Sequence, residues 1–154
     1  MLTEEEQKDV LAELEASEEP RSACVEALKI VQRRRGFVSD EAIRDLAPLL
    51  GMTVDELDSI ATFYSFIFRN PVGRHIILIC DSVTCWIMGY EGLLEHLRKS
   101  LNVGFGETTG DGRFTLLPVS CMGACDHAPA MIVDGKMYSD LDVQRLDEIL
   151  KAYK

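Results

Sequence analysis

The sequence lacks any apolar run long enough to cross a membrane, and it lacks an excess of basic residues. None of its apolar stretches approaches the roughly 18 residues that a membrane-spanning helix requires. Its 154 residues include 26 acidic and 16 basic side chains, which gives a formal net charge of −10. This charge argues against a nucleic-acid phosphate backbone as partner. We therefore expect a protein that neither inserts into a membrane nor binds nucleic acid.

Two common redox and cofactor motifs are also missing. No C-x-x-C dithiol is present, and Gly104-Phe105-Gly106 is not followed by the third glycine of a dinucleotide-binding loop. The segment Met1–Glu6 is acidic rather than basic and apolar, so we expect no secretory signal and a cytoplasmic location. Disulfides are rare in that compartment, and paired cysteines there more often bind metal or take part in redox chemistry.

The first 72 residues predict a small helical bundle. Thr3 with Glu6 and Thr53 with Glu56 have the spacing of capping boxes, and Ser39 precedes a third periodic stretch. The segment Asn70-Pro71-Val72-Gly73 interrupts these patterns, and we place a domain boundary there, between residues 1–72 and 73–154.

The pattern after this boundary alternates between strands and helices. We predict strands at 75–80, 114–119 and 130–133, a hairpin turn at Asp134-Gly135 into 136–138, and helices at about 85–101 and 141–153. The order β-α-β-β-α is that of a small thioredoxin-like fold, so the whole chain belongs to the α+β class. Pro129 lies where such folds often hold a cis proline, and we expect one here.

Four cysteines form two closely spaced pairs, Cys80-x4-Cys85 and Cys121-x3-Cys125. Each pair lies in a tight connection after a predicted strand, where backbone N–H groups are free to point at sulfur. Two irons bridged by two sulfides take four thiolates, two at each iron. Structural zinc also uses four thiolates in spaced pairs. The spacing favours a [2Fe–2S] cluster over zinc without deciding between them.

The surroundings of these cysteines predict hydrogen-bond donors to sulfur. We expect a helix that starts at Cys85, N–H groups from loops 81–84 and 122–124, and the hydroxyls of Ser82, Thr84 and Ser120. Because Asp81 and Asp126 adjoin the pairs and add negative charge, a cluster here should have a low reduction potential.

The remaining chemically notable residues have plainer interpretations. Cys24 lies on the apolar face of a predicted helix, so we expect a buried core residue. His127 has no partner motif and is expected at the surface. The aromatic run 63–68 is expected mainly in the core, with a docking strip for a partner as the alternative and a split between the two roles open. Trp86 is expected to pack rather than to relay electrons. The basic run 33–35 fits a solvated helix end or a docking contact equally well.

With these residues in place, the chain resembles the 24-kDa-type [2Fe–2S] subunit of NADH:quinone oxidoreductase, respiratory complex I. The resemblance runs from about Ala27 to the end of the chain. It is carried by Ala61-Thr62-Phe63-Tyr64 with Phe66, Cys80-x4-Cys85, the stretch 108–116, Cys121-Met122-Gly123-Ala124-Cys125 and Ala128-Pro129.

The resemblance implies a helical region followed by a thioredoxin-like ferredoxin domain. It implies that Cys80, Cys85, Cys121 and Cys125 hold one [2Fe–2S] cluster that exchanges single electrons with FMN. FMN and NADH are expected on a flavoprotein partner subunit, with other hydrophilic-arm subunits nearby, and no catalysis is expected from this chain alone. The complex would hold the chain peripherally at the inner membrane.

Two alternatives stay open at this point. Related subunits occur in NAD-linked hydrogenases and formate dehydrogenases, which place the same kind of domain in a different assembly. A structural adaptor with zinc at the four cysteines would share the fold and lack the electron transfer.

Overall fold

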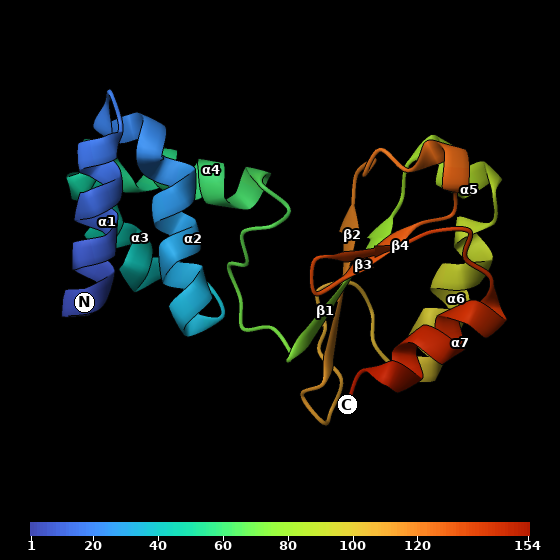
Figure 1. Cartoon of the computed structure of the whole chain (residues 1–154). Coiled ribbons are helices and arrows are strands. Elements are labelled where there is room, and N and C mark those ends of the chain that lie inside the picture. The colour runs from blue at the N-terminus through green and yellow to red at the C-terminus, as the bar shows by residue number, and fades with distance from the viewer. The chain divides into compact units, whose positions relative to one another are not determined.

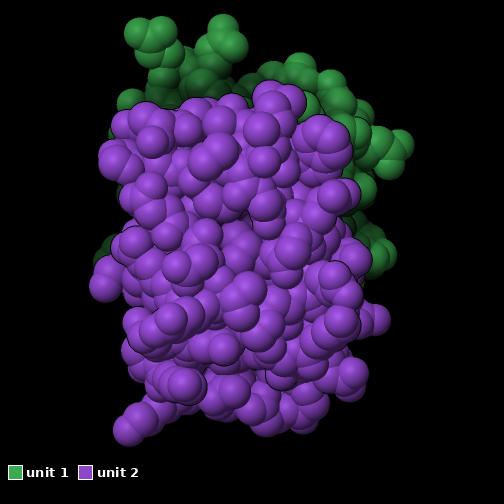
Figure 2. All heavy atoms as spheres, turned by 90° about the vertical axis from the view of Figure 1, so that its right-hand side faces the viewer, with its two compact units in different colours: residues 1–71 green, residues 72–154 purple.

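The structure is a computed structural model that describes residues 1–154, and it divides into two compact units, Met1–Pro71 and Val72–Lys154. Figure 2 colours the two units separately. No helix in the structure combines the length and apolar character that crossing a bilayer would take.

The first unit is helical (Figure 1). Its elements are α1 (Glu4–Ala16), the 3-10 turn η1 (Pro20–Ala23), α2 (Cys24–Arg35), α3 (Asp40–Leu49) and α4 (Val54–Phe63). Both predicted capping boxes form: the Thr3 hydroxyl accepts from the Glu6 N–H, and the Thr53 hydroxyl accepts from the Glu56 N–H. Ser39 caps α3 in the same way, as predicted. The local sequence therefore sets where these three helices begin.

The basic run 33–35 forms the last turn of α2, and its arginines make ion pairs with carboxylates of α1 and α2. Arg35 donates to both carboxylate oxygens of Glu6, with its Nε at 2.6 Å from Oε1. Arg34 lies 2.5 Å from Glu5. The two glutamates differ sharply in burial: the side chain of Glu6 is 1% exposed and that of Glu5 is 79% exposed.

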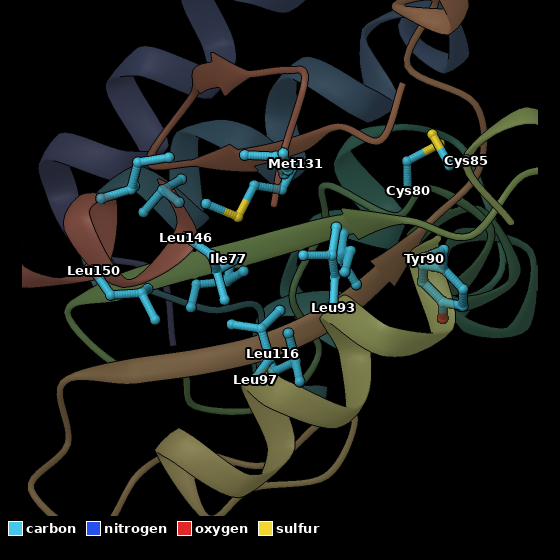
Figure 3. Close-up of a cluster of buried hydrophobic side chains, with 14 of the residues drawn as sticks. Ile77, Cys80, Cys85, Tyr90, Leu93, Leu97, Leu116, Met131, Leu146 and Leu150 are labelled. Atoms are coloured by element: carbon cyan, nitrogen blue, oxygen red, sulfur yellow. The ribbon is translucent and has the colours of Figure 1, made fainter. Parts of the chain in front are cut away.

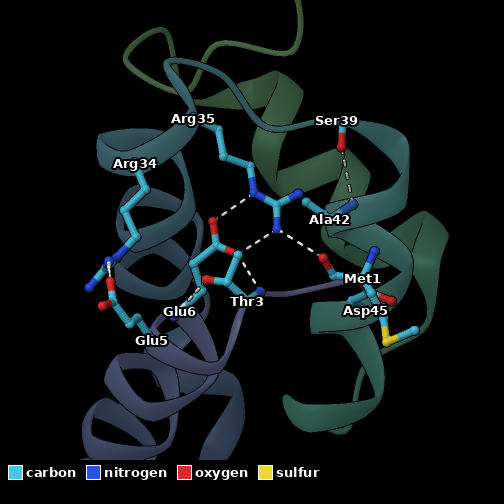
Figure 4. A network of polar contacts seen from close by, with 9 residues as sticks. All are labelled: Met1, Thr3, Glu5, Glu6, Arg34, Arg35, Ser39, Ala42 and Asp45. Atoms are coloured by element: carbon cyan, nitrogen blue, oxygen red, sulfur yellow. Dashed lines mark hydrogen bonds and ion pairs between the residues drawn. The ribbon is translucent and has the colours of Figure 1, made fainter.

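The Glu6–Arg35 pair is the centre of a polar network that fixes the start of the chain (Figure 4). The second carboxylate oxygen of Glu6 also accepts from the Thr3 N–H at 2.8 Å. Arg35 donates to the Met1 carbonyl at 3.2 Å, and the Met1 amino group lies 3.2 Å from Asp45 on α3. Residues from α1, α2 and α3 are thereby joined around one buried carboxylate.

The second unit packs helices on a four-stranded sheet. Its elements are β1 (His75–Cys80), α5 (Val83–Ile87), α6 (Tyr90–Leu101), β2 (Phe114–Val119), the 3-10 turn η2 (Cys125–His127), β3 (Met131–Val133), β4 (Lys136–Tyr138) and α7 (Val143–Ala152). The strand order is β2-β1-β3-β4, with β1 and β2 parallel and the other neighbours antiparallel. The predicted β-α-β-β-α order and the α+β class are confirmed.

The core of the second unit lies between the sheet and its two longer helices (Figure 3). Ile77 of β1 is buried with Leu93 and Leu97 of α6 and with Leu146 of α7. Alternate residues of a strand face the same side, so Ile77 and Ile79 both point into this core. Pro118 is tolerated within β2 because that strand lies at the edge of the sheet.

Two local predictions in this unit are confirmed. Asp134 and Gly135 both have positive φ, 49° and 80°, which is the backbone of a tight hairpin turn between β3 and β4. The Ala128–Pro129 peptide bond is cis.

Candidate metal centre

Two neighbouring strands, which end on the same side of the sheet, bring the four cysteines of the two pairs together. Cys80 is the last residue of β1, and Cys121 follows β2 by two residues. Because β1 and β2 are parallel, with Cys80 opposite Val119, the segments that follow them leave the sheet at the same C-terminal end of the strands. Parallel pairing is thus what joins cysteines that are far apart in the sequence.

The helix predicted from Cys85 to residue 101 is two helices, and its predicted start is wrong. Helix α5 begins at Val83, with Ser82 as N-cap, so Cys85 occupies the third helical position. Helix α5 ends at Ile87, and Gly89 adopts a φ of +106° before α6 begins. That backbone conformation strongly favours glycine. The break leaves Cys85 on a short segment of its own, attached to the loop after β1.

The cysteines form one buried pair and one exposed pair. Cys80 and Cys85 are each 2% exposed and close to one another at one end of the core, beside Tyr90 (Figure 3). Cys121 and Cys125 are exposed, with their sulfurs 3.3 Å apart. No three His, Cys, Asp or Glu side chains form a group that could hold a single metal ion. Two pairs of thiols are the donor set that two irons take.

Burial raises the pKa of a thiol in this site, and nearby hydrogen-bond donors lower it. Burial, together with the neighbouring Cys80, raises the pKa of the Cys85 thiol to about 11. The N–H of Gly123 donates to the Cys121 sulfur at 3.4 Å and lowers the pKa of that thiol. Gly123 has a φ of +84°, a conformation that lets its N–H turn back onto the sulfur two residues earlier. This donor lies in the loop where the sequence predicted one.

One donor was not predicted from the sequence. The backbone N–H of Ala130 partly offsets the effect of burial on the pKa of the Cys85 thiol. The Ala130 carbonyl accepts from the Cys80 N–H at 3.1 Å. Ala130 thus contacts both members of the buried pair through its backbone alone. Its side chain carries no signal, and only the pairing of β3 with β1 could have located it.

Cys24 and His127 have the plain roles expected of them. Cys24 is buried among the helices of the first unit. His127 is exposed, and its Nδ1 lies 3.0 Å from Asp140. Neither adds to the donor set of the four cysteines.

The expectation that the aromatic residues lie mainly in the core is wrong. Phe63 is 81% exposed, and Tyr64 and Phe66 are also exposed. Helix α4 buries Leu57 and Ala61, which are four residues apart, so Phe63 falls on the opposite side. The chain then leaves the helix, and Ile67 returns to the core of the first unit.

Trp86 is likewise exposed rather than packed in the core. It belongs to a group of four exposed apolar residues on and just after α5, which we call the α5 patch: Val83, Trp86, Ile87 and Met88. Within this segment of the chain the patch directly flanks a cysteine of the buried pair. An apolar patch of this kind on a protein surface often marks an interaction site.

Comparison with known proteins gives consistent results over nearly the whole chain. The family model for thioredoxin-like [2Fe–2S] ferredoxins matches residues 8–154. A subunit of the NADH-quinone oxidoreductase of Pseudomonas aeruginosa is 47% identical over 153 residues, covering 99% of this chain and 92% of the relative. The corresponding subunit of the Escherichia coli NADH-quinone oxidoreductase is 48% identical with the same coverage.

A solved structure is similar to most of this chain at lower sequence identity. One chain of an NAD+-reducing [NiFe]-hydrogenase in the H2-reduced state superposes with a TM-score of 0.70 and 27% identity over 85% of this chain. The present chain spans only 22% of that hydrogenase chain.

Proposed function

Because the chain belongs to the thioredoxin-like [2Fe–2S] ferredoxin family, whose cofactor is one [2Fe–2S] cluster, we propose that Cys80, Cys85, Cys121 and Cys125 hold that cluster. The observation that carries this assignment is the donor set at the carboxyl edge of β1 and β2. It offers two thiols after each strand, and the Gly123 N–H donates to a sulfur of the exposed pair. Cys24 belongs to the other unit and is left out of the set.

The residues around the sulfurs fit a negatively charged group. Thiolate ligands and bridging sulfides give the site a net negative charge, which hydrogen-bond donors stabilise. Gly123 supplies such a donor from the backbone, with its nitrogen 3.4 Å from the Cys121 sulfur. A [2Fe–2S] cluster supplies one-electron redox chemistry when bound. The chain itself holds the sulfurs, limits the access of water to the buried pair and sets the local charge.

The function we infer is that of the electron-transfer subunit of an NADH:quinone oxidoreductase, respiratory complex I. Single electrons would pass between this chain and the FMN of an NADH-binding flavoprotein subunit, and catalysis would belong to the assembly. The relatives named as subunits of that oxidoreductase, 47% and 48% identical over nearly full length, support this inference. The assembly would hold the chain at the cytoplasmic side of the inner membrane.

The α5 patch supports the proposal that a partner docks beside the cluster site. Ile87 is 70% exposed and lies two residues from Cys85. Electron transfer requires the donor and acceptor to approach closely, and apolar residues around the site can exclude water from such a contact. We propose that the flavoprotein subunit covers the α5 patch, with other hydrophilic-arm subunits on the remaining surface.

A related assembly is the second candidate. The 27% identical chain of an NAD+-reducing [NiFe]-hydrogenase supports a diaphorase role in such an enzyme. The much higher identity to the oxidoreductase subunits favours complex I. Co-purification distinguishes the two, because the partners of the tagged chain would be either quinone-reductase subunits or a hydrogenase large subunit.

The test of the ligand assignment is metal content after purification without oxygen. We expect about two irons and two acid-labile sulfides per chain, the composition of a [2Fe–2S] centre, and an S = 1/2 EPR signal after dithionite reduction. Replacing any of the four cysteines by alanine should lower the iron content, while Cys24→Ala should leave it unchanged. About one zinc per chain without an EPR signal would overturn the redox function and leave the fold intact.

A further inference from the structure

Thr115 of β2 is a buried hydroxyl that the cluster site does not use. It is 1% exposed, and the only other charged or strongly polar residue buried to this degree is Glu6, in the first unit. Thr115 lies in the stretch 108–116, which carries part of the family resemblance. Its oxygen accepts from the Gly73 N–H at 2.6 Å and lies 2.7 Å from the Thr108 hydroxyl. The hydroxyl therefore joins β2 to the segment that leads into β1.

The backbone after Gly73 is held by the same part of the second unit. The Arg74 N–H donates to the Gly112 carbonyl at 3.1 Å, and the His75 N–H donates to the Arg113 carbonyl at 2.8 Å. A Cβ on Gly73 would lie 3.0 Å from the Gly112 oxygen and 3.1 Å from the Arg113 backbone, closer than such contacts normally come. Only glycine lets the segment approach this closely, because the neighbouring atoms belong to the backbone.

The other end of the segment between α4 and β1 (Figure 1) is held by the first unit. The Gln32 side chain accepts from the Phe68 N–H at 2.6 Å and donates to the Phe66 carbonyl at 2.8 Å. The next residue, Arg69, donates from its Nε to Asp58 at 2.9 Å. These contacts fix the chain as far as Arg69.

Asn70, Pro71 and Val72 lie between the two held regions and make no hydrogen bond. Pro71 has no N–H and a fixed φ, and it restricts Asn70 to extended conformations. Rotation is therefore left mainly to ψ of Pro71 and to the two torsions of Val72. At no more than about 3.6 Å per residue, the Cα atoms of Arg69 and Gly73 can separate by roughly 14 Å at most.

We propose that the contacts of Thr115 with Gly73 and of Gln32 with Phe68 confine all bending between the two units to a hinge at residues 70–72. A few residues of this kind commonly absorb the torsion changes of a hinge. The helical unit can then reorient while β1, and the cysteine at its end, keep their place in the sheet. A tether this short also holds the second unit at high effective concentration near any partner that the first unit binds. None of these contacts involves a cysteine, so the inference is independent of the ligand assignment.

The test is amide hydrogen exchange of the full-length chain, followed residue by residue by NMR. In the parent protein, Gly73 and Arg74 should be protected, whereas Asn70 and Val72 should exchange at close to the rate of an unstructured peptide. Thr115→Val keeps the shape of the side chain and removes its hydroxyl, so exchange at Gly73 should become roughly three- to tenfold faster. Thr115→Ser keeps the hydroxyl and should retain the protection of the parent protein.

A second variant adds bulk instead of removing an acceptor. Gly73→Ala places a methyl group against the neighbouring backbone and should speed exchange at Arg74 as well as at residue 73. Gly110→Ala is the matched control, because a Cβ at Gly110 meets no atom within 4 Å, and it should leave exchange at Arg74 unchanged. Ile77 and Ile79, both buried in the sheet, should stay protected in every variant and so report an intact fold.

Unchanged exchange at Gly73 in Thr115→Val and in Gly73→Ala would overturn the role of Thr115. Slow exchange at Asn70 and Val72 in the parent protein would overturn the hinge, whatever the variants show. A variant that loses protection at Ile77 as well has unfolded, and the exchange of the other variant then decides. Iron and sulfide content reports separately on the cluster, so failure of the hinge and failure of the proposed function are distinguishable.

Discussion

Replacing Glu6 by glutamine should remove much of the stability of the first unit. The carboxylate is buried, and hydrogen bonds from Arg35 lower the pKa of Glu6 from 4.5 to about 2, against the opposing effect of burial. One pKa unit corresponds to about 1.4 kcal/mol, so the ionised form contributes roughly 3 kcal/mol at neutral pH. Glutamine keeps the capping box with Thr3 and removes only the charge, which isolates the ion pair.

The sign of the pH dependence follows from the lowered pKa. Because the folded value lies below the unfolded value, this contribution is present above about pH 4.5 and is lost as the pH falls toward 2. Glu6→Gln should lack that part of the acid dependence. Its matched control is Glu5→Gln, which breaks the exposed pair with Arg34 and should cost less than about 1 kcal/mol.

The assay must report on the first unit. The single tryptophan, Trp86, belongs to the second unit, so its fluorescence would follow the wrong part of the chain. Amide hydrogen exchange of Val10 and Leu28, both fully buried in the first unit, measures local unfolding directly. Equal protection from exchange in Glu6→Gln and Glu5→Gln at pH 7 would refute this prediction. It would show that burial adds nothing to the stability that the Glu6–Arg35 ion pair contributes.

Hydrogen bonding to Asp134 raises the pKa of His75, so an NMR titration should give a value above 6.5 that falls in Asp134→Asn. The stability that the His75–Asp134 pair adds should be complete below pH 6.5 and should decline as the pH rises through the folded pKa of His75. The same dependence of stability on pH in the parent protein and in Asp134→Asn would contradict this prediction. Gly36 ends α2 with a φ of +81°, so Gly36→Ala should lower the free energy of unfolding by about 1 kcal/mol in urea titration, and an unchanged value would show that the turn relaxes. Asp126→Asn should raise the midpoint potential of the cluster by removing a neighbouring charge, and a lower midpoint in redox titration would refute this. Ile87→Glu should reduce co-purification with the flavoprotein subunit while iron content stays at the parent level, and full recovery of the complex would argue against docking at the α5 patch.

Local features of the structure follow closely from the sequence. Capping boxes, the strand 75–80 and the turn at Asp134-Gly135 depend on a few adjacent residues, and all appear where they were predicted. The cysteine pairs lie at or just after the ends of β1 and β2 for the same reason, since apolar runs bounded by turns locate buried strands. The parallel pairing of strands β1 and β2 brings the two cysteine pairs together, and the β-α-β order implies that pairing.

The features that the sequence did not predict depend on residues far away in the chain. The break at Gly89 interrupts a periodic stretch, and only a positive φ reveals it. The exposure of Phe63 depends on which side of α4 packs against other helices, and the partners of run 33–35 come from α1 and from within α2. The Ala130 donor is a backbone group and has no side-chain signal. Each of these needed tertiary structure to be seen.

The separation of the two cysteine pairs along the chain determines when, relative to translation, the cofactor can be inserted. Residues 86–120 lie between Cys85 and Cys121, and translation at about 5–20 residues per second delays the second pair by seconds. During that interval the first pair has no complete site, because β2 has not yet paired with β1. We therefore expect cofactor insertion to be a post-translational event that requires a formed sheet, so that a chain truncated before β2 would be synthesised but never loaded.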